Sequence, residues 1–181
     1  MIKFPITLIL GGARSGKSIF AEQMAEKSDK KLIYIATAEA HDDEMVNRIT
    51  LHQSRRCDRW RTIEEPYNIA DMIGEHADPE VILLIDCLTL WLSNLMCRSR
   101  DLMPHFVSLI SSLENVSGPV MLVANEVGLS IVPENNLARA FRDEAGRLNK
   151  AVASAASDVI FMAAGLPMSL KKDGKVISRH L

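Results

Sequence analysis

Short apolar runs alternate along the chain with longer segments in which apolar residues recur at helical spacing. Within each run the apolar residues are consecutive rather than alternating, as is typical of strands buried on both faces of a parallel sheet. The runs cover residues 6–10, 32–36, 81–85, 120–124 and 159–163. We therefore predict five strands in a mostly parallel sheet.

The segments between these runs predict helices on the faces of the sheet. They cover residues 18–27, 42–55, 68–75, 88–96, 104–114 and 136–156. The second segment opens with Asp42, Asp43 and Glu44, and acidic residues suit a helix N-terminus. Strands that alternate with helices form βαβ units, so the pattern predicts an α/β fold. A length of 181 residues fits a single domain.

The C-terminal segment departs from this alternation. Leu166 and Pro167 interrupt the pattern, and the stretch from Lys172 to Lys175 contains Asp-Gly, a turn signal. The flanking segments predict either a terminal hairpin or a frayed end, and the pattern leaves both open.

Composition and charge narrow the classes of function. The net charge is −2, with acids and bases mixed along the chain, which argues against a broad nucleic-acid interface. The three cysteines, Cys57, Cys87 and Cys97, lack metal-ligand spacing, so we predict free thiols in a reducing compartment. No apolar stretch reaches the roughly 18 residues that span a bilayer. We therefore expect a cytoplasmic protein without a membrane span.

The sequence GGARSGKS follows the first predicted strand and opens the first predicted helix. This is a P-loop, whose backbone N–H groups cradle phosphates. Lys17 would reach the β- and γ-phosphates, and the Ser18 hydroxyl would contact Mg²⁺. Its predicted nucleotide-binding residues are Gly11, Gly12, Ala13, Arg14, Ser15, Gly16, Lys17 and Ser18. A chance match in a glycine-containing turn is the alternative, and the flanking strand and helix disfavour it.

Asp86 ends the apolar run VILLI at the carboxyl end of a predicted strand. Ligands of parallel sheets gather at those ends, and an aspartate there can hold Mg²⁺ through water. The alternative is that Asp86 caps the helix predicted to begin at Leu88. The P-loop favours the magnesium role.

His52 lies among arginines in the segment that follows the second strand. Ile49 and His52 share a predicted helix face, with Arg48, Arg55 and Arg56 close in sequence. Burial among cations would oppose protonation of a histidine, so this is a poor core position and a good phosphate site. A solvated basic helix face with an incidental histidine is the other interpretation. The pattern alone does not establish catalysis by His52.

A further polar stretch follows the fourth strand. Asn125 and Glu126 occupy a strand end. The last predicted helix carries Arg139, Arg142, Asp143 and Arg147. The alternative here is an ion-paired surface helix without a binding role.

The motifs occur in one order over most of the chain and together resemble a known family. They are GGARSGKS, YIAT, DDEM with RI and His52, WRTIE, LLIDCLTLWLSNL, NEVG with IVPEN, and FRDEAGRLN. The chain resembles the bifunctional adenosylcobinamide kinase/adenosylcobinamide-phosphate guanylyltransferases of cobalamin biosynthesis from about Ile6 to Lys171.

This resemblance implies two reactions at one nucleotide site. The family phosphorylates adenosylcobinamide with ATP or GTP, then transfers GMP from GTP to adenosylcobinamide phosphate through a GMP-histidine. By position, His52 and Lys17 are the catalytic residues, with Ser18 and Asp86 at Mg²⁺. The remaining nucleotide contacts implied by position are Ala36, Thr37, Ala38, Gln53, Ser54, Arg55, Arg56, Glu64 and Asp86.

The resemblance also implies a P-loop NTPase fold with a RecA-like sheet, and a homotrimer. Two other functions stay open at this point. One is a P-loop NTPase or small-molecule kinase in which His52 is inert, and the other is a nucleotide-dependent switch with little chemistry.

Overall fold

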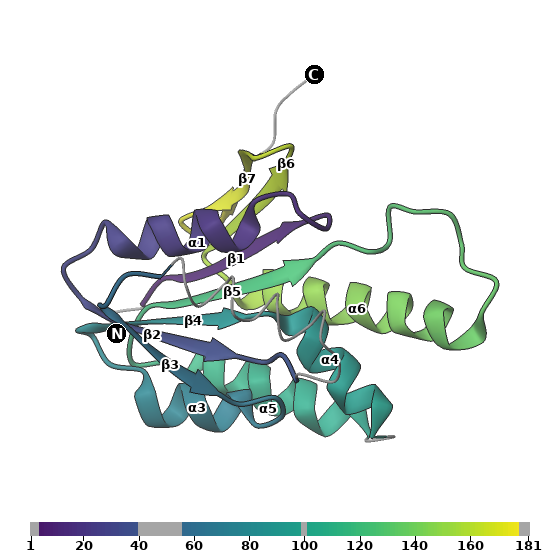
Figure 1. Cartoon of the computed structure of the whole chain (residues 1–181), viewed down its shortest axis with the longest axis horizontal. Coiled ribbons are helices and arrows are strands. Elements are labelled where there is room, and N and C mark those ends of the chain that lie inside the picture. Colours follow the sequence, from purple (N-terminus) through teal and green to yellow (C-terminus); the bar gives the residue numbers. More distant parts are fainter. Residues whose placement is uncertain (1–3, 40–55, 99–100, 178–181) are drawn as a thin grey trace.

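The computed structural model describes residues 4–39, 56–98 and 101–177. In this part of the chain the strands form one eight-stranded sheet in the order β3-β2-β4-β5-β1-β6-β7-β8 (Figure 1). The strands are β1 (Ile6–Gly11), β2 (Lys31–Ala36), β3 (Trp60–Glu64), β4 (Val81–Asp86), β5 (Val120–Asn125), β6 (Asp158–Ala163), β7 (Leu166–Lys172) and β8 (Lys175–Val176). All pairings from β3 to β6 are parallel, so the predicted mostly parallel sheet is confirmed.

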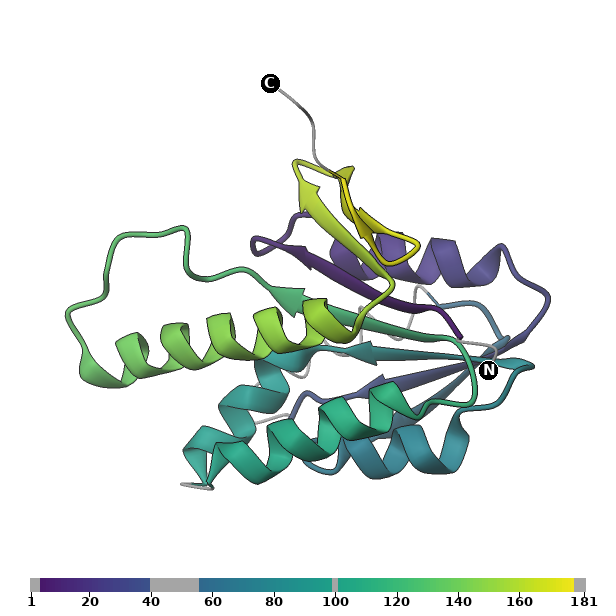
Figure 2. The same cartoon turned by 180° about the vertical axis from the view of Figure 1, so that it is seen from behind.

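Helices cover both faces of this sheet. They are α1 (Lys17–Glu26), α3 (Ile69–His76), α4 (Leu88–Cys97), α5 (Leu102–Glu114) and α6 (Asn136–Ala155). Helix α1 packs on one face, and α3 to α6 pack on the other (Figures 1 and 2). The strands explain this division, since Leu8 and Leu10 of β1 face α3 to α6 while Ile9 faces α1. None of the helices in the described ranges is long and apolar enough to cross a bilayer.

The apolar runs alone did not predict two parts of the sheet, strand β3 and the β7–β8 hairpin. Strand β3 is an edge strand in which Arg61 and Thr62 are exposed, so its sequence lacks a buried apolar run. At the other edge, β7 pairs antiparallel with β6 and β8, which confirms the terminal hairpin over the frayed end. The helix predicted for residues 42–55 lies outside the described residues.

The position of β1 determines where a ligand can bind. This first strand lies between β5 and β6 in the middle of the sheet. Its carboxyl end therefore meets the carboxyl ends of β4 and β5 at one edge, which we call the P-loop edge and define by Gly11–Ser18, Asp86 and Asn125.

Candidate active site

The P-loop takes its shape from glycines at the end of β1 and the start of α1. A Cβ atom at Gly11 would collide with the carbonyl oxygen of Met162 and lie 2.7 Å from Ser15 Oγ. Gly16 has a left-handed φ of 93° and forms the N-cap of α1 without a side-chain hydrogen bond. The N–H groups at this helix start are therefore left for an anion, as expected of a phosphate cradle.

Lys17 lies inside the loop. Its side chain is buried, and Nζ donates hydrogen bonds to Gly12 O at 2.6 Å and Ser15 Oγ at 3.5 Å. Burial lowers the pKa of Lys17, while the nearby Cys87 and Asp86 act in the opposite direction. A phosphate bound to the loop would meet this ammonium within the cradle and would favour its charged form.

The turn between β6 and β7 supports the loop from outside. Ala164 and Gly165 have φ values of 50° and 80°, which suit a two-residue hairpin turn. Gly165 N donates to Ser15 O at 3.2 Å. A segment near the C-terminus thus fixes the backbone of a loop near the N-terminus.

Asp86 ends β4 on the same edge of the sheet. Its Oδ2 atom is buried and has no hydrogen-bond partner among the described residues. The N-cap of α4 is Cys87, whose Sγ accepts from Leu90 N at 3.5 Å, so the proposed capping role of Asp86 is wrong. A buried carboxylate oxygen without a partner is costly unless a proton or cation reaches it.

Tyr34 and Arg56 flank this carboxylate. Burial, with a smaller contribution from Asp86, raises the pKa of Tyr34 far above its ordinary value, so the phenol stays neutral. The Arg56 guanidinium carbon lies 3.7 Å from the centre of the Tyr34 ring, which is cation–π geometry. Arg56 Nη1 is buried without a hydrogen bond to any described residue. The arrangement puts a positive group near the P-loop edge.

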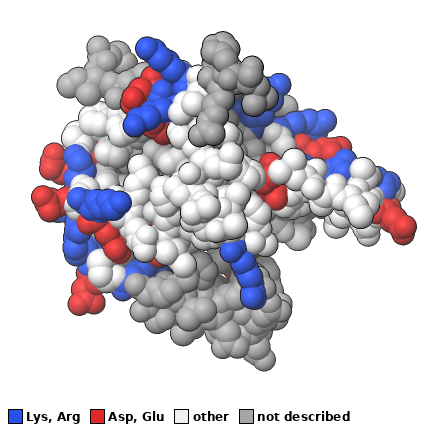
Figure 3. All heavy atoms as spheres, turned by 90° about the horizontal axis from the view of Figure 1, so that it is seen from above, with Lys and Arg blue, Asp and Glu red and all other residues white. Residues whose placement is uncertain are grey.

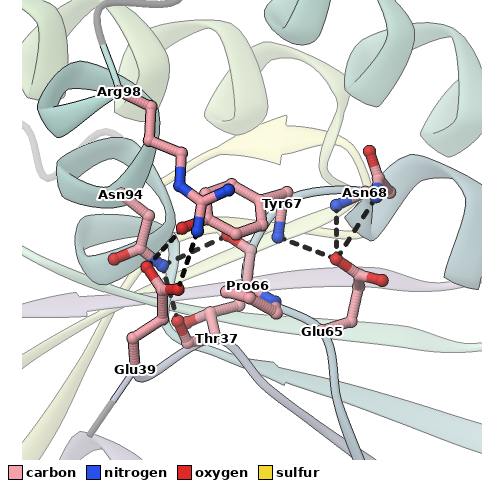
Figure 4. A network of polar contacts seen from close by, with 8 residues as sticks. All are labelled: Thr37, Glu39, Glu65, Pro66, Tyr67, Asn68, Asn94 and Arg98. Atoms are coloured by element: carbon pink, nitrogen blue, oxygen red, sulfur yellow. Dashed lines mark hydrogen bonds and ion pairs between the residues drawn. The ribbon is translucent and has the colours of Figure 1, made fainter. Parts of the chain in front are cut away.

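Thr37 connects the end of β2 to the end of β4. Its hydroxyl donates to Cys87 O at 2.8 Å and accepts from Cys87 N at 2.7 Å. Asn94 Nδ2 of α4 donates to Thr37 O at 2.8 Å (Figure 4). Thr37 is fully buried, so its hydroxyl positions the residues after Asp86.

A polar network continues from Thr37 to the surface. The Tyr67 hydroxyl donates to Glu39, and Arg98 Nη2 lies 3.4 Å from Glu39 Oε1 (Figure 4). The Arg98 guanidinium also lies 4.2 Å from the centre of the Tyr67 ring. These contacts join the residues just after β2 to the C-terminal half of α4 and to the segment after β3, and they fix the backbone around Thr37 and Glu39.

Several predicted site residues meet at one row across the sheet. Ala36 lies opposite both Glu64 and Asp86 in the strand register, and Gly11 lies opposite Asn125. Glu64 is exposed at the end of β3, and Ala38 is partly exposed just beyond β2. His52, Gln53, Ser54 and Arg55 lie outside the described residues.

Tyr34 and Asn94 lie beside the site, and the sequence motifs did not predict a role for either. Both are buried. Tyr34 stacks against the predicted site residue Arg56, and Asn94 donates a hydrogen bond to the predicted site residue Thr37. A polar residue inside an otherwise apolar strand or helix is the signal that could have identified them.

The thiols follow their predicted state. All three cysteines are free, with Cys57 and Cys97 exposed and Cys87 buried. Burial, and secondarily Asp86, raises the pKa of the Cys87 thiol to about 12. Among the described residues, no group of three or more His, Cys, Asp or Glu side chains could hold a metal ion.

Comparison with known proteins agrees with the family resemblance of the sequence motifs. The sequence profile of the family described as cobinamide kinase / cobinamide phosphate guanyltransferase matches residues 7–170. A protein of Pseudomonas aeruginosa named bifunctional adenosylcobalamin biosynthesis protein CobP is 48% identical over 166 residues, covering 91% of this chain and 96% of that protein. The Escherichia coli protein named bifunctional adenosylcobalamin biosynthesis protein CobU is 36% identical over 179 residues, covering 91% of this chain and 98% of that protein.

Solved structures support the fold independently of sequence. The flagellar accessory protein FlaH of Methanocaldococcus jannaschii matches with a TM-score of 0.54 and 11% identity, covering 93% of this chain and 79% of that one. An ATPase from the type III secretion system of pathogenic bacteria matches with a TM-score of 0.52 and 16% identity, covering 91% of this chain and 56% of that one. The fold is that of P-loop NTPases, and the sequence match shows that the chain belongs to the cobinamide kinase / cobinamide phosphate guanyltransferase family.

Proposed function

We propose that this protein phosphorylates adenosylcobinamide with ATP or GTP and then transfers GMP from GTP to the new phosphate. The product is adenosyl-GDP-cobinamide, an intermediate of cobalamin biosynthesis. The observation that carries the proposal is a complete P-loop facing Asp86 in a chain that matches the family over residues 7–170.

In the kinase step, the P-loop presents the γ-phosphate of the nucleotide. The aminopropanol hydroxyl of adenosylcobinamide loses its proton to solvent as its oxygen bonds to the γ-phosphorus. The bond from that phosphorus to the bridging oxygen breaks, and ADP or GDP leaves. Lys17 offsets the charge on the phosphates, and the loop N–H groups hold them in line.

In the guanylyl step, we assign the nucleophile to His52. Its imidazole nitrogen attacks the α-phosphorus of GTP, and pyrophosphate departs while the P-loop holds its phosphates. A phosphate oxygen of adenosylcobinamide phosphate then attacks the same phosphorus and frees the histidine. The assignment of His52 rests on its place in the sequence motif.

The residues at the P-loop edge fit a magnesium ion. Asp86 supplies a buried oxygen that accepts no hydrogen bond from the described residues, and Ser18 supplies a hydroxyl directly after Lys17. Mg²⁺ is commonly held by one or two carboxylates together with water and substrate phosphates. When bound, it would neutralise phosphate charge during both transfers.

The other predicted contacts receive roles by position. We assign Arg56 to the phosphate charge, because its guanidinium is aligned on Tyr34 near Asp86. Thr37 is assigned a positioning role, because its hydroxyl already bonds Cys87. Ala36, Ala38, Gln53, Ser54, Arg55 and Glu64 are proposed contacts to the nucleotide.

Two further proposals concern the protein as a whole. The family resemblance supports a homotrimer. The free thiols and the use of ATP and GTP support a cytoplasmic enzyme.

Incubation with GTP labelled at either the α- or the γ-phosphate tests the proposal. We expect α-label on the protein that is labile to acid and stable to alkali, and its absence in His52→Ala. We also expect γ-label to move to adenosylcobinamide. Transfer of γ-label without a protein adduct would instead identify a kinase in which His52 is inert, and tight binding without any product would identify a switch.

A further inference from the structure

A groove opens beside the P-loop edge, between the loop that follows β5 and helix α6. Its volume is about 600 Å³. Gly128, Ser130 and Val132 line it from the loop. Arg142, Arg147 and Lys150 line it from the helix. The volume lies within the range typical of small-molecule sites.

The helix side of the groove is basic although the whole protein is slightly acidic. Three cations line it with one acid, Asp143, whereas the net charge of the chain is −2. Arg142 pairs with Asp143 at 3.3 Å, and Arg147 pairs with Glu144. The Lys150 ammonium has no hydrogen bond or ion pair with any described residue. The groove therefore suits a ligand with an anionic group.

The basic side begins next to the P-loop. Asn149, which precedes Lys150, donates to Asn125 O at 3.3 Å at the end of β5. Glu126 N then donates to Gly11 O at 3.0 Å. Arg142 lies about 12 Å from Lys150 along the axis of α6, on the side away from the end of β5. A ligand lying along the groove can thus reach the nucleotide with one end only.

The outer wall belongs to a projecting segment, residues 126–135, which we call the arm (Figures 1 and 2). Leu129 and Ile131 on it are 84% and 94% exposed. Arg139 holds the arm to α6 by donating to Pro133 O at 2.9 Å and Glu134 O at 2.5 Å. In Figure 3 the arm and the start of α6 project together from the body, and the basic side chains there belong to α6, because Glu126 and Glu134 are the charged residues of the arm. The arm thus offers apolar surface beside polar groups.

We propose that this groove binds the acceptor of both reactions, an amide-rich corrinoid that carries a hydroxyl or a phosphate ester. The inference rests on the proposed function. Lys150 and Arg147 take the phosphate close to the P-loop edge. The macrocycle lies toward Arg142 and the apolar arm, with Asp143 available to accept hydrogen bonds from its side-chain amides.

Acceptor kinetics of the full protein test this assignment. In Lys150→Ala we expect KM for adenosylcobinamide phosphate to rise about tenfold, with a smaller rise for unphosphorylated adenosylcobinamide. Lys150→Arg should restore most of the affinity. The matched control is Lys31→Ala, an exposed lysine at the opposite end of the sheet, which should leave both values unchanged.

Labelling of the protein with α-labelled GTP in the absence of corrinoid separates the possible failures. A wild-type protein that neither labels nor transfers contradicts the proposed function, and direct corrinoid binding by equilibrium dialysis then still tests the groove. If the wild type is active and Lys150→Ala has a normal acceptor KM, the groove assignment is wrong.

Val132→Asp separates ligand binding from subunit contact. We expect a raised KM for both acceptors and an unchanged oligomeric state by light scattering, because Val132 lines the groove that the macrocycle would fill. A changed oligomeric state with a normal KM would show that the arm contacts another subunit, and would overturn the proposal.

Discussion

The P-loop edge and the arm with its groove lie side by side but are built in opposite ways. At the P-loop edge Lys17 is buried, as is Cys87 directly after Asp86, and the loop is bonded to itself and to the β6–β7 turn. On the arm, Leu129 and Ile131 are almost fully exposed, and Arg147 and Lys150, which line the groove, are exposed as well. The nucleotide cradle is therefore preorganised by the fold. The binding groups of the neighbouring groove, in contrast, stay solvated until a ligand covers them.

The largest contrast should appear in thiol reactivity. A pKa of about 12, against an ordinary value of 9.0, leaves the buried Cys87 with about 1,000-fold less thiolate at a given pH. We expect a disulfide reagent at pH 8 to modify Cys57 and Cys97 quickly and Cys87 at least that much more slowly. Mass spectrometry of modified peptides measures this. Equal rates at all three sites would contradict a closed P-loop edge, and guanidinium-unfolded protein provides the control.

Lys17→Ala should abolish the preorganised charge of the cradle. We expect both γ-phosphoryl transfer and protein labelling by α-labelled GTP to fall at least about 100-fold, as for loss of a group that stabilises transition-state charge. Lys27→Ala, an exposed lysine just after the same helix, is the matched control. Full kinase activity in Lys17→Ala would show that the two reactions do not share one cradle.

A pair of glycine substitutions tests how tightly the loop is packed. Gly11→Ala would push a methyl group into the Met162 carbonyl, so we expect a loss of about 1–3 kcal/mol in the free energy of unfolding. Gly12→Ala meets nothing within 4 Å and should stay within about 0.5 kcal/mol of the wild type. Urea unfolding measures both, and equal losses would mean that the loop is not fixed by Met162.

The smallest expected effect lies on the arm. Ile131→Ser should change the free energy of unfolding by less than about 0.5 kcal/mol, because its side chain is 94% exposed. Leu148→Ala, on the buried side of α6, should cost about 2–5 kcal/mol. A large loss in Ile131→Ser would show that the arm is packed in solution, and the contrast between the two regions would disappear.

The sequence predicted the features that depend on continuous burial or on a strict motif. The five buried strands appear as apolar runs, and the P-loop follows from glycines that a close backbone approach demands at Gly11. Strand β3 could not be predicted this way, since an edge strand leaves Arg61 and Thr62 exposed.

The groove was equally hidden in the sequence. The arginines of α6 are compatible with an ion-paired surface helix, and Arg142 and Arg147 do form such pairs. Only the path of the arm, which places Val132 in one groove with Arg147 and Lys150, shows that this helix face lines a groove. A side chain's distance from a remote loop is set by tertiary packing, which local patterns do not encode.

The central place of β1 has a consequence for synthesis on the ribosome. The first strand to be made can pair with β5 only after residue 125 has appeared, and with β6 only after residue 163. Most of the chain must therefore emerge before its earliest strand finds both neighbours, a late and non-local pairing of the kind that slows folding. A nascent chain gains its phosphate cradle near the end of translation, so a truncated product would be unable to sequester nucleotide.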